Sequence, residues 1–189
     1  MHFRSHAWTL ACFLAAGPAA AEPASADLCT PPQRVMFHCT LGAKSVSLCA
    51  GMEGERIASL AFRYGLPSKV EVSYAVDAAG AAEGQRFAAT VGPLAPRASV
   101  RQLWFTRDDS TWLLSQCVGG DCPQSARLSV LKGDRIVSNR HCRRSDDDRA
   151  WFARALVHFG GDASESRSNT ELVVIDDIDH GIERLYAAR

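Results

Sequence analysis

Residues 34–49 read R-V-M-F-H-C-T-L-G-A-K-S-V-S-L-C, and residues 57–76 read I-A-S-L-A-F-R-Y-G-L-P-S-K-V-E-V-S-Y-A-V. Apolar and polar residues alternate within short runs of both segments, which is the period-2 pattern of strands with one buried face. Glycine and proline separate these runs, as they do where a chain turns. We therefore expect this part of the chain to form strands that follow one another through short connections.

The same alternation recurs beyond this stretch, in residues 85–91, 99–106, 111–118, 126–131 and 135–141. The connections are too short to hold a helix, so neighbouring strands are expected to be antiparallel. Alanine and glycine in residues 77–84 predict a flexible connection, and Gly92-Pro93 is expected to end the strand before it. The predicted fold class is mainly β, an antiparallel sandwich or a partly open barrel.

The pattern changes to helical spacing after Ser145. One apolar stripe is formed by Trp151, Phe152, Ala155, Leu156 and Phe159. Ser145 or Asp146 is suited to cap such a helix, and we expect the helix to pack on the sheet, with Phe152 buried. Residues 172–175 are a candidate last strand, and residues 178–188 a candidate short terminal helix.

The first 21 residues are typical of a secretory signal peptide. A basic start at Arg4 precedes an apolar core, and Ala19-Ala20-Ala21 matches a cleavage site before Glu22. The apolar core is too short to cross a bilayer as a helix. We expect residues 22–189 to form a single exported domain, periplasmic or secreted, with no membrane insertion after cleavage.

The charge of the chain is balanced, with 21 basic and 21 acidic residues. This balance argues against nucleic acid as a partner. The one dense basic group, Arg140-His141-Cys142-Arg143-Arg144, is followed at once by Asp146-Asp147-Asp148. Local charge neutralisation in a solvated turn is the interpretation we favour for this pair of runs.

Six cysteines remain after the signal peptide: Cys29, Cys39, Cys49, Cys117, Cys122 and Cys142. An even number in an exported chain indicates disulfides. Cys117 and Cys122 flank a four-residue loop between two predicted strands, so we expect them to be joined. A two-residue turn at Gly42-Ala43 would place Cys39 opposite Val46 and Cys49 opposite Met36, on opposite faces. A Cys39–Cys49 bond would then need a bulge, and bonds to Cys29 and Cys142 compete with it.

Part of the opening stretch resembles a group of small exported bacterial proteins whose function is unsettled. The resemblance rests on Phe37-x-Cys39, on Lys44 with Cys49, on Phe62-Arg63-Tyr64-Gly65 and on Lys69-x-Glu71. It implies export and a β fold, and it brings no active-site residues to this chain.

Two weak metal candidates come from a repeated dipeptide, His38-Cys39 and His141-Cys142. If the two cysteines meet on an inner face, the two histidines are expected on the outer face, where imidazoles can bind a metal. Incidental surface histidines are the interpretation we favour, and no cofactor is expected. The acidic run at Asp176-Asp177 and Asp179 lacks the spacing of a calcium loop and is better explained as the start of a helix.

No catalytic motif is present in the sequence. Arg63, Tyr64 and Trp104 are residue types that interfaces use as anchors. Export, disulfides and near-zero charge favour a non-enzymatic protein that binds another protein, such as an inhibitor, an immunity-type protein or an accessory protein. The alternative is a small envelope hydrolase, for which Glu71 and Asp109 are the candidate carboxylates.

Overall fold

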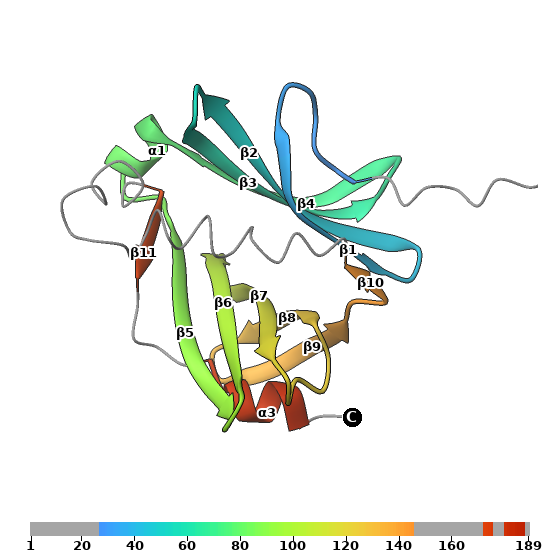
Figure 1. The fold of residues 1–189 in the computed structure, drawn as a ribbon. Coiled ribbons are helices and arrows are strands. Elements are labelled where there is room, and N and C mark those ends of the chain that lie inside the picture. The colour runs from blue at the N-terminus through green and yellow to red at the C-terminus, as the bar shows by residue number, and fades with distance from the viewer. Residues whose placement is uncertain (1–26, 146–171, 176–179, 188–189) are drawn as a thin grey trace, which may run out of the picture.

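The computed structural model describes residues 27–145, 172–175 and 180–187. The strands form two sheets that lie one above the other in Figure 1. In sheet order, the first contains β10 (Arg144–Ser145), β1 (Arg34–Leu41), β2 (Lys44–Glu53), β3 (Arg56–Leu66) and β4 (Lys69–Asp77). The second contains β11 (Val173–Ile175), β5 (Phe87–Ala95), β6 (Ala98–Arg107), β7 (Ser110–Gly119), β8 (Ala126–Lys132) and β9 (Arg135–His141).

The predicted fold class is confirmed: the protein is mainly β, with antiparallel neighbours along each run of consecutive strands. One pair, for which no orientation was predicted, is parallel. Strand β11 was predicted as a last strand and is present, but it pairs with β5 in parallel. The reason is topological, because a segment that returns from far along the chain is free to run in either direction.

The core between the sheets is aromatic. Phe62 of β3 lies 5.0 Å from Phe105 of β6, measured between ring centroids. Tyr74 of β4 stacks on the Phe105 ring at 4.3 Å and meets the edge of Phe87 at 5.0 Å. Phe62, Phe87 and Phe105 are almost completely buried. These rings hold the two sheets together through the large apolar areas that they bury.

The connection between the sheets on the β4 side is a short helix, α1 (Ala78–Ala82), where a flexible connection was predicted. Asp77 caps it, since its carboxylate accepts a hydrogen bond from the Gly80 amide at 2.9 Å. The expected end of the next strand at Gly92-Pro93 is also wrong, because β5 continues to Ala95. Strand β11 pairs only with residues 87–89 of β5. Pro93 lies beyond these residues and faces Ser99 of β6 on the other side. Proline has no N–H to donate, and its place in β5 therefore breaks no hydrogen bond with β11.

The other helix labelled in Figure 1 is α3 (Ile182–Ala187), which lies on the outer face of the second sheet. It confirms the predicted C-terminal helix within shorter bounds. The side chains of Ile182, Leu185 and Tyr186 pack with Val100 and Trp104 of β6. Gly92 makes room for this contact, because a Cβ atom there would lie 2.7 Å from Ile182 Cδ1. The predicted helix containing Phe152 falls outside the described residues.

Three disulfides are present, and they join Cys29 to Cys49, Cys39 to Cys142, and Cys117 to Cys122. The predicted Cys117–Cys122 bond is confirmed. Cys39 lies opposite Val46 as expected, but a bulge between Val35 and Phe37 places Cys49 opposite Val35 rather than Met36. Cys49 is joined to Cys29 in the arm before β1, and Cys39 is joined to Cys142, which directly follows β9 of the second sheet.

No helix of the described residues is long and apolar enough to cross a membrane.

Candidate functional site

The seam between β9 and the first sheet is where the chain changes sheets. The Cys142 amide still donates to the Ala126 carbonyl of β8, at 2.9 Å, and the Arg143 amide already donates to the Thr40 carbonyl of β1, at 3.0 Å. The next two residues form β10, which pairs with Cys39 and Thr40. The Cys39–Cys142 disulfide crosses at the same point. One covalent bond and one short ladder therefore fix β9 against β1.

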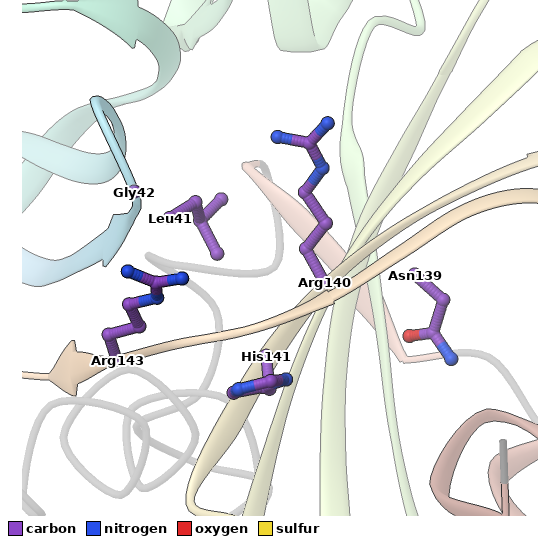
Figure 2. A pocket seen from close by; sticks show the side chains of 6 residues that line it. All are labelled: Leu41, Gly42, Asn139, Arg140, His141 and Arg143. Atoms are coloured by element: carbon purple, nitrogen blue, oxygen red, sulfur yellow. The ribbon is translucent and has the colours of Figure 1, made fainter. Parts of the chain in front are cut away.

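A groove of about 310 Å³ opens beside this crossing. One wall is the turn that follows β1, at Leu41 and Gly42, and the other comes from the end of β9 and the residues after it. In Figure 2 the Arg140 and Arg143 side chains lie on the same side of the strand as Leu41 and Gly42, whereas His141 lies on the other side. The groove is thus lined by two guanidinium groups and by the hairpin turn.

Both arginines are exposed. Among the described residues, neither guanidinium has a carboxylate within ion-pair distance. This sets them apart from Lys44, Arg97 and Lys132, which bind Glu71, Asp121 and Asp109. The groove therefore carries positive charge that the described part of the protein does not neutralise.

A third cation stands near the groove but is already paired. The Lys44 ammonium lies 2.7 Å from Glu71 Oε2 and 5.4 Å from the centroid of the Tyr64 ring. The hydrogen bond to Glu71 raises the pKa of Lys44, while the nearby Arg140 charge acts in the opposite direction. Because Glu71 balances Lys44, the net charge of this region comes from the two arginines.

For this basic group the sequence predicted a solvated turn with local charge neutralisation by Asp146-Asp147-Asp148, and the neutralisation stays a prediction. In the structure Arg140 belongs to β9, and Arg143 immediately precedes β10. The acidic run after Ser145 lies outside the described residues. The signal that was missed is structural, since Leu41 and Gly42 reach the arginines only through a pairing of segments about a hundred residues apart.

The three anchor candidates have roles inside the molecule. Arg63 Nη1 donates to the Leu28 carbonyl at 2.9 Å and to Gln33 Oε1 at 2.7 Å. The Tyr64 ring lies 5.7 Å from Trp112. Trp104 is buried and meets His180 edge-on, at 4.5 Å between centroids. Arg63 therefore holds the arm before β1, and Tyr64 and Trp104 pack against other aromatic rings of the protein.

The two histidine candidates lie in different sheets. His38 is buried on β1, where its Nδ1 lies 3.2 Å from Ser47 Oγ, and His141 is exposed at the end of β9. Their neighbours Cys39 and Cys142 are joined in a disulfide, so they carry no thiolates for zinc. Within residues 27–145, 172–175 and 180–187, no cluster of three His, Cys, Asp or Glu side chains is arranged to hold a metal.

The candidate carboxylates of a hydrolase are both engaged in ion pairs. Glu71 binds Lys44, and Asp109 binds Lys132 at 2.9 Å, with a second hydrogen bond from Ser110. The bond to Lys132 lowers the pKa of Asp109. Asp109 lies in the turn between β6 and β7, and Glu71 on β4 of the other sheet.

A second groove, of about 460 Å³, surrounds the Cys117–Cys122 loop. Its lining residues all lie between positions 116 and 125, and none of them is charged. The arginine groove is therefore the better candidate for specific recognition of a charged partner.

No family model, no curated protein and no solved structure matches this chain.

Proposed function

We propose that the protein is an exported, non-enzymatic binding protein of the bacterial envelope, which docks on another protein as an inhibitor, an immunity-type protein or an accessory protein. The signal-like residues 1–21 and the cleavage site before Glu22 support delivery to the periplasm. Three disulfides agree with an oxidising compartment.

The observation that carries this proposal is the groove with Arg140 and Arg143. Arginine is enriched at protein interfaces, because its planar guanidinium makes several directed hydrogen bonds and is weakly hydrated. The two exposed guanidinium groups line one wall of the groove, and the Cys39–Cys142 disulfide fixes the main chain that carries them. Because the main chain is already fixed, the conformational entropy lost on binding comes mainly from the two arginine side chains.

A capture experiment with matched variants tests the proposal. The purified mature chain is biotinylated and incubated with envelope extract, beside the double variant Arg140→Gln/Arg143→Gln and the control Arg135→Gln. Arg135 is also exposed and lies at the other end of β9. We expect a protein that is captured by the wild type and the control and lost with the double variant. Capture of the same proteins by all three chains would contradict a docking role for the groove.

A further inference from the structure

The arginine groove also indicates the chemistry of the partner. We propose, resting on the function proposed above, that the partner inserts an acidic segment in which two carboxylates bind Arg140 and Arg143. The groove is defined by its six lining residues: Leu41, Gly42, Asn139, Arg140, His141 and Arg143.

The first argument is charge complementarity. The exposed arginines share one wall, and no carboxylate of the described residues lies within ion-pair distance of either. A carboxylate meets a guanidinium through two parallel N–H···O bonds, which makes this pair stronger and more directional than a bond to a neutral group. A lysine-rich or neutral segment would add no counter-charge to two arginines that have none among the described residues.

The second argument is the arrangement of the two charges. Arg140 and Arg143 are separate positions whose side chains lie on the same side of the strand in Figure 2 and line the same groove. A single carboxylate is suited to one guanidinium fork, so two forks favour two carboxylates on one segment. The volume of about 310 Å³ fits a few side chains and not a folded domain. An acidic stretch of a loop or chain terminus is the occupant of this size and charge.

The third argument concerns the opposite wall. Leu41 is buried and Gly42 sits at a positive φ of +85°, in open space where a Cβ atom would meet nothing within 4 Å. The turn thus presents main chain and little side-chain bulk to the groove. An incoming segment can approach this wall closely, which places its side chains toward the arginines.

The test uses defined peptides and the full mature chain. The probe is a fluorescein-labelled peptide with two glutamates in a glycine-serine background, and its controls carry one or both glutamates replaced by glutamine. Binding is followed by fluorescence anisotropy at low ionic strength. We expect each Glu→Gln replacement, and each of Arg140→Gln and Arg143→Gln, to weaken binding about ten-fold, whereas Arg135→Gln changes it little.

A charge reversal distinguishes complementarity from damage to the fold. The double variant Arg140→Glu/Arg143→Glu is expected to lose the acidic peptide and to bind the matching lysine peptide. Inorganic phosphate and heparin are the competing anions. Displacement of the acidic peptide by millimolar phosphate alone would show a phosphate site and would overturn the proposal. Equal binding of the glutamate and glutamine peptides would also overturn it.

The outcomes separate this inference from the proposed function. If envelope capture depends on Arg140 and Arg143 but the acidic peptides do not bind, the docking function stands and the acidic segment is wrong. If capture is also independent of both arginines, both proposals fail.

Discussion

The outer faces of the two sheets are covered in different ways. On the first sheet the cover is the arm before β1, which is joined by the Cys29–Cys49 disulfide and by hydrogen bonds from Leu28 to Ser47 and from Arg63 to Leu28. On the second sheet the cover is α3, which packs through Ile182, Leu185 and Tyr186. An arm with few apolar side chains requires a covalent bond, whereas a short amphipathic helix is held by burial.

The two covers also differ in how they treat buried polar groups. Ser47 under the arm accepts a hydrogen bond from the Leu28 amide at 3.0 Å. On the second sheet, Gln102 and Ser115 are fully buried side by side on β6 and β7. Their side chains have no hydrogen-bond partner among the described residues. Burial raises the pKa of Tyr186 in the same region. The second cover also receives a directional contact, because Asn139 Nδ2 donates to the Leu185 carbonyl at 2.9 Å, so the difference between the covers lies in the Gln102–Ser115 pair.

The largest expected effect is on the apolar cover. Leu185 is completely buried, so Leu185→Ala should lower the free energy of unfolding by about 3–5 kcal/mol. Glu183, on the same helix, is exposed, and Glu183→Ala should stay within about 0.5 kcal/mol. Urea denaturation of both variants measures the difference. Equal midpoints would mean that α3 does not stabilise the second sheet.

The covalent cover gives the next effect. Replacing both Cys29 and Cys49 by alanine removes a bridge between residues separated by 20 positions in sequence. The chain-entropy model gives about 3 kcal/mol for a loop of this length. Reducing conditions should then destabilise the wild type more than this variant. A variant as stable as the oxidised wild type would show that the polar contacts of Arg63 and Ser47 hold the arm without the bridge.

The smallest effect concerns the polar pair under α3. Gln102→Leu keeps a similar volume and removes two buried polar atoms without partners among the described residues. The free energy of unfolding should therefore stay the same or rise by up to about 1 kcal/mol. A loss larger than about 1 kcal/mol would show that the amide has a hydrogen-bond partner in solution. Thermal and urea unfolding measure this change in stability, and they test whether Gln102, unlike Ser47, lacks a hydrogen-bond partner.

These features differ in how far the sequence predicts them. Alternation located the central strands because each has one apolar and one polar face, and it located β9 with its observed bounds. The Cys117–Cys122 bond followed from a local loop. The partners of Cys39 and Cys49 could not be derived, because the arm and Cys142 reach them only in the folded chain.

Two predictions made from local sequence were wrong because contacts with other residues determine the local structure. The Ala-Gly segment after Asp77 forms α1 because Asp77 caps it, and Pro93 lies inside β5 because β11 pairs only with the first part of that strand. The arginine groove escaped prediction for a similar reason. Arg140 and Arg143 line a groove together with Leu41 and Gly42, which are about a hundred residues away in the sequence.

The arm cover and the groove depend on which cysteines are joined, so mapping of disulfides in the purified protein tests the account most directly. Non-reduced proteolytic peptides, identified by mass spectrometry, should contain Cys29 with Cys49, Cys39 with Cys142, and Cys117 with Cys122. A Cys39–Cys49 bond, or a free Cys142, would contradict the arrangement of the seam and remove the basis of the groove.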